Sequence, residues 1–207
     1  MHAMKRFISL LFSCLAFAAV AQEAPDVLVK RVTEEVLEVV RADRELQNGN
    51  TQRAVELIEQ KILPHFNFTR MTRLALGREW NKASSEQQQK LTEEFRTLLV
   101  RTYSNALTGY RNQTLRFKPF KMNAGEQEVL VQSEILRPGG PVLPVDYSLE
   151  KVGNTWKVFD VVVDGISLVI SYREQFTQEV RAHGVDGLIK AVAAKNRSFE
   201  TGKANNK

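Results

Sequence analysis

The sequence predicts an α+β fold, in which helices cover one face of a curved, four-stranded antiparallel sheet. Apolar residues recur at helical spacing through most of residues 26–110, and alternating apolar and polar residues follow through residues 113–163. Residues 159–176, FDVVVDGISLVISYREQF, then change from a β-branched run to helix-like spacing across Asp164-Gly165. This junction joins a sheet to a helix, and its apolar run at Val161–Val163 requires other parts of the chain to pack on the sheet.

The first 21 residues have the pattern of a cleaved secretory signal peptide. Lys5 and Arg6 precede an apolar segment over residues 7–20, which ends in the cleavage pattern Ala19-Val20-Ala21. About 14 apolar residues are too few to span a bilayer comfortably. Cys14 lies too early in this segment for a lipoprotein attachment site. We therefore expect export to the periplasm.

The chain that remains after cleavage is expected to be one domain held together by its core. Cys14 is the only cysteine, so the remaining 186 residues can form no disulfide, although an exported protein could use them. This length suffices for one sizeable core, and no second apolar run approaches transmembrane length. We predict a soluble domain over residues 22–196 and a disordered polar tail over residues 197–207.

Four helices are predicted before residue 113. The first covers residues 26–43, and the second runs from Thr51, a plausible N-cap, to just before Pro64. The third covers residues 68–76 and ends at Gly77. The longest opens with a capping box at Ser84 or Ser85 and continues to about residue 110 with a wide, aromatic-rich apolar stripe.

Four strands are predicted next, at residues 114–120, 128–136, 142–151 and 155–163. The turn sequences Pro138-Gly139-Gly140-Pro141 and Gly153-Asn154 are too short to join anything but antiparallel neighbours. We expect a meander. A helix is then predicted from Ile166 to about Gly184, and another from Val185 to Val192.

The charge distribution favours an anionic ligand or surface as a partner. Residues 70–121 carry 11 basic and 4 acidic side chains, whereas the segments on either side are slightly acidic. There are no clustered basic runs interleaved with aromatic residues, so we predict no nucleic-acid binding. An anionic membrane surface or ligand head group fits this charge better.

No catalytic or metal site is predicted. His65 and His183 stand alone, without metal-ligand spacing around them, and neither a G-x-S-x-G elbow nor a glycine-rich phosphate loop is present. Asp160 and Asp164 could form an acid/base pair, but strand-end and turn hydrogen bonds explain them better. We therefore predict that the protein is not an enzyme and binds something apolar.

Two blocks of the sequence carry recognisable motifs in a fixed order. The C-terminal block is VFDVVVDGISLVISYREQF followed by HGVDGLIKAV. The central block is ILPHFNFTRMTRLALGREWNKASSEQQQKLTEEFRTLLVRTYSNAL, with its Leu-Pro, Leu-Gly and F-R-x-L-L patterns. Together these motifs resemble the MlaC or toluene-tolerance (Ttg2-type) family of periplasmic phospholipid-binding proteins, auxiliary components of an ABC lipid transport system. The resemblance covers residues 26–196, nearly the whole exported chain.

The resemblance implies a soluble periplasmic shuttle for a glycerophospholipid. Such a carrier holds the acyl chains in an apolar pocket between sheet and helices, passes the lipid between an outer-membrane lipoprotein complex and an inner-membrane ABC transporter complex, and maintains outer-membrane lipid asymmetry. It needs no cofactor, and we expect a monomer. A carrier of another lipophile, such as a fatty acid, sterol-like lipid or solvent, stays open, as do an enzyme on a similar scaffold and a protein-binding adaptor.

Two sets of residues are candidates for binding. We expect the pocket to be lined by the long helix, the inner sheet face and the strand-to-helix junction, with these members: Leu91, Phe95, Leu98, Leu99, Tyr103, Val131, Val145, Tyr147, Val161, Val163, Ile166 and Val169. We expect the basic middle third to attract anionic head groups or an acidic partner through these side chains: Arg70, Arg73, Arg78, Lys82 and Arg116.

Overall fold

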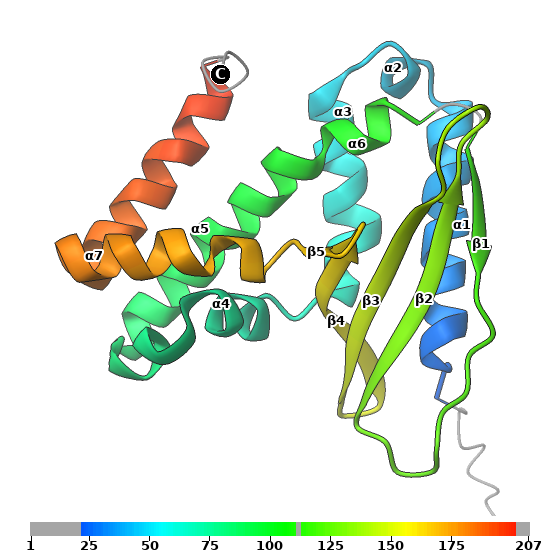
Figure 1. Cartoon of the computed structure of the whole chain (residues 1–207). Coiled ribbons are helices and arrows are strands. Elements are labelled where there is room, and N and C mark those ends of the chain that lie inside the picture. Colours follow the sequence, from blue (N-terminus) through cyan, green and yellow to red (C-terminus); the bar gives the residue numbers. More distant parts are fainter. Residues whose placement is uncertain (1–21, 111–112, 202–207) are drawn as a thin grey trace, which may run out of the picture.

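The structure, a computed structural model, describes residues 22–110 and 113–201. The expected signal peptide and residues 202–207 of the expected tail lie outside this range. The described part contains helices, then an antiparallel sheet, then a long C-terminal helix, as Figure 1 shows. None of its helices is both long and apolar enough to cross a membrane.

The N-terminal half is helical, and its breaks follow local sequence signals. Helix α1 (Pro25–Ala42) is followed by α2 (Arg44–Gln47) and α3 (Thr51–Leu57). The chain then widens into a π-helical turn (Ile58–Ile62) and tightens into a 3-10 turn (Leu63–His65), where Pro64 ends the helix as predicted. Thr51 is not the N-cap of α3: Asn50 is, because its side chain accepts a hydrogen bond from the Arg53 amide.

The next two helices match their predicted starts. Helix α4 (Phe68–Leu76) ends at Gly77, whose φ of 62° suits glycine, and a 3-10 turn (Gly77–Lys82) follows. Helix α5 (Ser85–Tyr103) begins with the expected capping box between Ser84 and Gln87. It ends before residue 110, since a separate short helix, α6 (Asn105–Thr108), follows Ser104.

The sheet is an antiparallel meander in the order β1-β2-β3-β4-β5. Its strands are β1 (Thr114–Phe117), β2 (Glu128–Leu136), β3 (Leu143–Val152), β4 (Thr155–Val163) and β5 (Ile166–Ser167). The register between β2 and β3 places Val131 beside Tyr147 and Ser133 beside Val145. These four side chains share one face, called the inner face below.

The fifth strand corrects the prediction of a helix beginning at Ile166. Asp164 and Gly165 both have positive φ, 50° and 79°, which makes a tight turn that reverses the chain. Ile166 and Ser167 can therefore pair with Val163 and Val162. A 3-10 turn (Ile170–Tyr172) follows, and helix α7 (Arg173–Glu200) begins only at Arg173.

Helix α7 is kinked at Gly184, where a helix end was predicted. Gly184 has φ 70° and ψ 179°, outside the helical region, and the helix resumes from Val185. The second half continues to Glu200, so residues 197–200 are helical and do not belong to the predicted polar tail. Buried Asn196 holds this half against α5 through hydrogen bonds from its amide nitrogen to the Glu94 carbonyl and carboxylate, at 2.9 and 2.7 Å.

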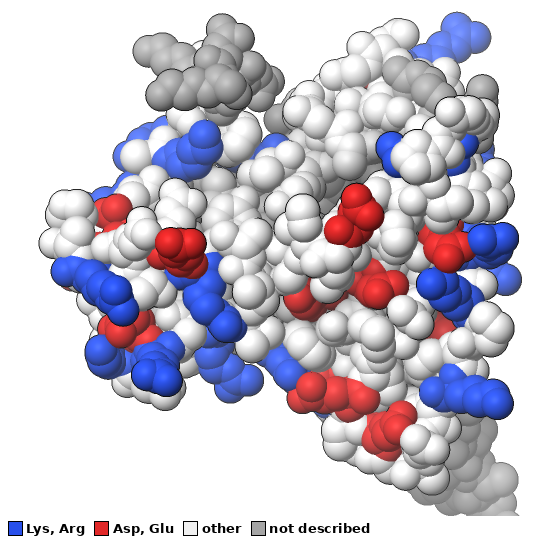
Figure 2. Space-filling view, in the orientation of Figure 1, with Lys and Arg blue, Asp and Glu red and all other residues white. Residues whose placement is uncertain are grey.

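Helix α1 lies across the inner face of the sheet, and the opposite face is exposed to solvent (Figure 1). The contact between them is a cluster of buried residues on α1 and strands β2, β3 and β4: Leu28, Val29, Val131, Leu149, Trp156 and Val158. Figure 2 shows acidic side chains spread over the strands, and basic ones gathered over α4, the following 3-10 turn and the first half of α7.

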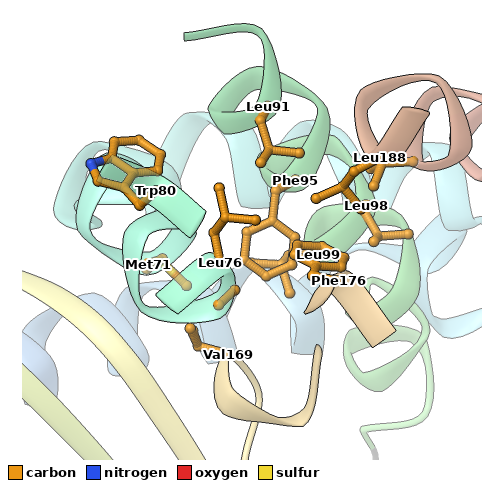
Figure 3. Close-up of a cluster of buried hydrophobic side chains, with 12 residues drawn as sticks. Met71, Leu76, Trp80, Leu91, Phe95, Leu98, Leu99, Val169, Phe176 and Leu188 are labelled. Carbon is orange, nitrogen blue, oxygen red and sulfur yellow. The ribbon is translucent and has the colours of Figure 1, made fainter. Parts of the chain in front are cut away.

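A second, larger core joins helices α4, α5 and α7. Phe95 is fully buried at its centre and makes edge-to-face contacts with Tyr172 and Phe176, with ring centroids 5.2 Å apart in both pairs. Figure 3 shows Leu76, Leu91, Leu98 and Leu188 around the rings of Phe95 and Phe176. This densely packed lobe lies beside the sheet and fixes the helices that border the space between them.

Candidate functional site

The space between α1 and the inner sheet face contains an apolar cavity of about 300 Å³, called cavity 1. The π-helical and 3-10 turns after α3 close one side of it, and α6 closes another. Its lining combines these elements: Leu28, Val29, Val32, Thr33, Val36, Leu37, Ile62, His65, Phe66, Ala106, Leu107, Tyr110, Thr114, Leu115, Ile135, Tyr147 and Val158. The volume falls within the range of small-molecule sites, roughly 300–1,000 Å³.

A second apolar cavity of about 170 Å³, called cavity 2, lies between the first and the helical lobe. It is bordered by α4, α5, α6, the π-helical turn and the end of the sheet: Ile58, Ile62, Leu63, Phe66, Phe68, Met71, Leu99, Val100, Tyr103, Leu107, Val161 and Leu168. Except for the hydroxyl of Tyr103, these side chains offer a ligand only hydrocarbon and a thioether.

Three side chains line both cavities and form the partition between them: Ile62, Phe66 and Leu107. Backbone contacts with β4 place Phe66 there, because the Asn67 amide donates to the Val158 carbonyl at 2.8 Å and Phe66 forms a bridge with Val158. Its ring stacks on Phe68, with centroids 5.9 Å apart. The two cavities therefore adjoin through side chains alone.

The π-helical turn helps to shape this partition. Ile58 and Ile62, at its two ends, both line cavity 2, and Ile62 also reaches cavity 1. A π turn accommodates one residue more than an α turn, and such turns are frequent at functional sites.

Tyr147 and Thr33, two of the polar side chains that face cavity 1, have partners within the protein. Burial raises the pKa of Tyr147, whose hydroxyl lies by those of Ser133 and Thr33. The Ser133 hydroxyl donates to the Val145 carbonyl at 2.9 Å, and that of Thr33 to the Val29 carbonyl at 2.7 Å. Both hydroxyls are thus oriented to accept from Tyr147.

Two further ionisable groups at the cavities are held in their neutral forms. Burial and a hydrogen bond with Tyr172 raise the pKa of Tyr103, in cavity 2, to about 12. Burial, with Arg31 and Lys157 nearby, lowers the pKa of half-buried His65. Both side chains are neutral at pH 7, which suits an apolar ligand.

The predicted pocket residues lie in several places. Leu99, Tyr103 and Val161 line cavity 2, and Tyr147 lines cavity 1. Four others belong to the helical core of Figure 3: Leu91, Phe95, Leu98 and Val169. Val131 and Val145 are buried on the inner sheet face, Val163 is half-buried, and Ile166 is 64% exposed at the β4–β5 turn.

Most of the lining of cavity 1 comes from segments that the sequence analysis did not name as pocket lining. Helix α1, the turns around Pro64 and α6 contribute the majority of cavity 1. The apolar spacing of residues 28–40 signals a buried helix face, but the spacing is the same whether that face meets side chains or an empty space. The Leu-Pro step at residue 63 was a visible signal of a break, and it marks the partition.

The five predicted basic residues divide into two groups. Arg70 lies 3.6 Å above the Phe159 ring and pairs with Glu150 at 2.6 Å and Glu128 at 2.7 Å. Arg116 pairs with Glu134 at 2.5 Å, and Lys82 with Glu79 at 2.9 Å. Within residues 22–110 and 113–201, no acidic side chain pairs with Arg73 or Arg78, and both are exposed.

The described residues hold no cluster of three or more His, Cys, Asp or Glu side chains that could bind a metal ion. Asp160 accepts hydrogen bonds from the Ser167 hydroxyl at 2.6 Å and from the Val161 amide at 2.8 Å. The Ser167 oxygen in turn accepts from the amides of Val169 and Ile170. These bonds tie β4 to the 3-10 turn, and burial raises the pKa of Asp160.

Comparisons with known proteins agree with an apolar binding site. The sequence model of the family described as MlaC protein matches residues 30–194. The toluene tolerance protein ttg2D of Pseudomonas putida is 28% identical over 184 residues, which cover 88% of this chain and 85% of that protein. The intermembrane phospholipid transport system binding protein MlaC of Haemophilus influenzae is 24% identical over 192 residues, covering 89% and 90%.

A solved structure gives the corresponding comparison in three dimensions. The phospholipid-binding protein of Ralstonia solanacearum, solved in complex with a phospholipid, matches with a TM-score of 0.77 and 37% sequence identity. The match covers 87% of this chain and 98% of that one. The similarity therefore includes the sheet, the helices and the space between them.

Proposed function

This chain belongs to the MlaC family, and from that premise we propose that it is a periplasmic carrier that holds a glycerophospholipid by its acyl chains. It exchanges the lipid with an outer-membrane lipoprotein complex and an inner-membrane ABC transporter complex, and so maintains the lipid asymmetry of the outer membrane. It acts as a monomer, without a cofactor and without chemistry on the bound lipid.

The observation that carries this proposal is the pair of adjoining apolar cavities, about 300 and 170 Å³, between sheet and helices. Water in such a space would find few hydrogen-bonding partners, whereas hydrocarbon would gain dispersion contacts on every side. We assign one acyl chain to each cavity, which enlarges to hold it, with the partition of Ile62, Phe66 and Leu107 between the chains. The head group stays outside.

The energy of transferring a lipid explains why a carrier needs so much apolar wall. Exposing two acyl chains of about 30 methylenes to water costs on the order of 24 kcal/mol, at ~0.8 kcal/mol for each methylene. A carrier must replace most of that interaction, yet still release the lipid to a partner. Two cavities separated by side chains alone can enlarge by rotamer changes, without unfolding the lobes around them.

The proposed contacts with the acyl chains include both predicted and newly located residues. Tyr147 belongs to cavity 1, and Leu99, Tyr103 and Val161 belong to cavity 2. Six other members of the predicted set contribute indirectly: Val131 and Val145 hold the inner sheet face, and Leu91, Phe95, Leu98 and Val169 hold α5 against its neighbours.

A second part of the proposal concerns the basic surface of Figure 2. Arg73 and Arg78 are exposed at the end of α4 and in the following turn, and can attract an acidic partner face or an anionic membrane. Lys82 lies at the end of the same turn, whereas Arg70 and Arg116 form ion pairs with neighbouring carboxylates. Of the predicted set, Arg73 and Arg78 are therefore the preferred docking residues.

Native mass spectrometry of the protein purified from the periplasm tests the main proposal. The expected spectrum contains an adduct with the mass of one glycerophospholipid, and tandem fragmentation should release two fatty acids. An adduct with the mass of a single fatty acid or sterol would favour a carrier of that lipophile. A spectrum of bare protein under conditions that preserve lipid adducts of known carriers would count against the proposal.

A further inference from the structure

Cavity 1 opens sideways between α1 and the edge strand β1. Leu37, Thr114 and Leu115 line both this cavity and a neighbouring groove of about 540 Å³. The other walls of the groove are mostly charged: Lys30, Glu34, Glu38, Arg41 and Phe117. An acyl chain that leaves cavity 1 past Leu37 and Leu115 would bring its head group among these charges.

Charged side chains of both signs follow one face of α1 at this opening, with two carboxylates between two cations. Lys30, Glu34 and Glu38 follow one another at i, i+4 spacing, and Arg41 lies one turn beyond Glu38, so all four project beside Leu37. All four are exposed. Glu34, Glu38 and Arg41 thus lie within about two helical turns of one another, whereas Lys30 lies roughly 16 Å from Arg41 along the helix.

Arg41 is fixed at the rim of the cavity. Its guanidinium donates to the Tyr110 hydroxyl at 2.9 Å and lies 5.7 Å from the centre of the Tyr110 ring, which lines cavity 1. The Tyr110 hydroxyl donates in turn to the Gln113 carbonyl at 2.5 Å. This arrangement leaves the other guanidinium hydrogens directed away from Tyr110 and available to an anion.

The opposite charges at the opening are poorly matched within the protein. In the part of the chain that the structure describes, no carboxylate pairs with Arg41 and no cation pairs with Glu38. Lys30 and Glu34 are 3.9 Å apart, at the outer limit of an ion pair. A ligand with one positive and one negative charge could therefore pair with Arg41 and Glu38, which otherwise face solvent.

We propose that this opening is a head-group site selective for zwitterionic phospholipids that carry a primary amine, of the phosphoethanolamine type. The phosphate binds Arg41 through the forked geometry that guanidinium groups offer to phosphates. The ammonium donates hydrogen bonds to Glu38, with Glu34 beside it. A phosphoglycerol head group would reach Arg41 equally well but would leave both carboxylates facing an anionic lipid.

This inference rests on the proposed function, because it concerns the lipid bound in cavity 1. The test uses delipidated full-length mature protein and vesicles that contain equal amounts of phosphatidylethanolamine and phosphatidylglycerol with identical acyl chains. After incubation and separation from the vesicles, native mass spectrometry gives the ratio of the two bound lipids.

Three proteins besides the wild type are compared. The double variant Glu34→Gln/Glu38→Gln removes both carboxylates from the opening. The control Glu93→Gln/Glu174→Gln makes the same change in net charge on exposed positions of α5 and α7 that line neither cavity nor groove. Arg41→Gln removes the contact with the phosphate, which both lipids share.

The wild type and the control should bind more phosphatidylethanolamine than phosphatidylglycerol. The ratio should fall by about two- to five-fold in the double variant, the range expected for exposed ion pairs. Arg41→Gln should lower the uptake of both lipids with less change in their ratio. The proposal is overturned if the double variant keeps the wild-type ratio, or if the control shifts it equally.

The outcomes also separate this inference from the proposed function. A wild type that loads both lipids without preference, and a double variant that does the same, leave the carrier function intact and refute the head-group site. A wild type that loads neither lipid refutes both. Circular dichroism confirms that each variant is folded before its lipid content is compared.

Discussion

Filling cavity 1 with protein should exclude the lipid without unfolding the domain. Val32 lies on α1, is half-buried and lines this cavity, so the side chain of Val32→Trp would project into empty space. The matched control is Val27→Trp, in the first turns of the same helix, where Val27 is 50% exposed and lines neither cavity.

The size of the effect follows from the atoms displaced. Tryptophan has about seven more heavy atoms than valine, each about the size of a methylene, and at ~0.8 kcal/mol for each displaced methylene the lipid loses up to about 6 kcal/mol. Since every ~1.4 kcal/mol is a factor of ten, the affinity should fall by on the order of ten-thousand-fold at most. Contacts between the indole and the remaining acyl chain will reduce this loss.

Two measurements decide the outcome. Lipid extraction from purified protein should show that Val32→Trp retains far less phospholipid than Val27→Trp and wild type. Urea denaturation of the delipidated proteins should show little difference, because overpacking a filled core would cost about 1–3 kcal/mol. Equal lipid content in the two variants, or a large loss of stability in Val32→Trp, would mean that the cavity is not the binding site.

Three further predictions concern the framework around the cavities. Phe95→Ala should lower the free energy of unfolding by about 3–5 kcal/mol in urea titrations of delipidated protein, because the ring is fully buried; a loss below 1 kcal/mol would be inconsistent with the core of Figure 3. Arg70→Gln should cost about 2–3 kcal/mol, because it leaves the partly buried Glu150 carboxylate without its cationic partner and with only the hydrogen bond from the Asn67 side-chain amide, and the same change at exposed Arg73 should cost almost nothing. The raised pKa of Asp160 favours the folded wild-type protein below the pKa of the unfolded chain, near 3.8, and this contribution is lost as the pH rises through the pKa of the folded state. The free energy of unfolding of Asp160→Asn should therefore increase relative to that of the wild type between pH 3 and pH 7. A difference between the two proteins that does not depend on pH would refute this.

Much of the fold could be predicted from local signals in the sequence. Ser84 and Gln87 form the predicted capping box, Gly77 and Gly184 stand at the predicted helix ends, and the two short turns join antiparallel strands as predicted. Each of these features depends on a few residues that are close together in the sequence, so their backbone preferences and spacing suffice to predict it.

The segment after Gly165 shows where local reasoning failed. Ile166, Val169 and Ile170 have helical spacing, yet the two positive φ angles at Asp164 and Gly165 turn the chain back onto β4. Pairing with Val162 and Val163 then decides the conformation of residues 166 and 167. Tertiary contact overrode the spacing, and no property of residues 166–170 alone reveals it.

The cavities were harder to locate for a different reason. Phe95 and Leu99 belong to the same apolar stripe of α5, but Phe95 meets the rings of α7 whereas Leu99 borders cavity 2. The apolar stripe identifies the buried positions of α5, but it does not show whether side chains or an empty cavity lie against them. A cavity is a shortage of side-chain volume between elements, so it depends on how α1, α5, α6 and the sheet are placed relative to one another.

The most direct test of the account is to locate a bound acyl chain. A phosphatidylethanolamine with a photoreactive diazirine near the end of one chain is loaded into the protein, irradiated, and mapped by peptide mass spectrometry. We predict labelling of the residues around the partition, on the segments that carry Ile62, Phe66 and Leu107. Labelling confined to the outer sheet face, or to the groove between α5 and α7, would contradict the claim that these cavities hold the lipid.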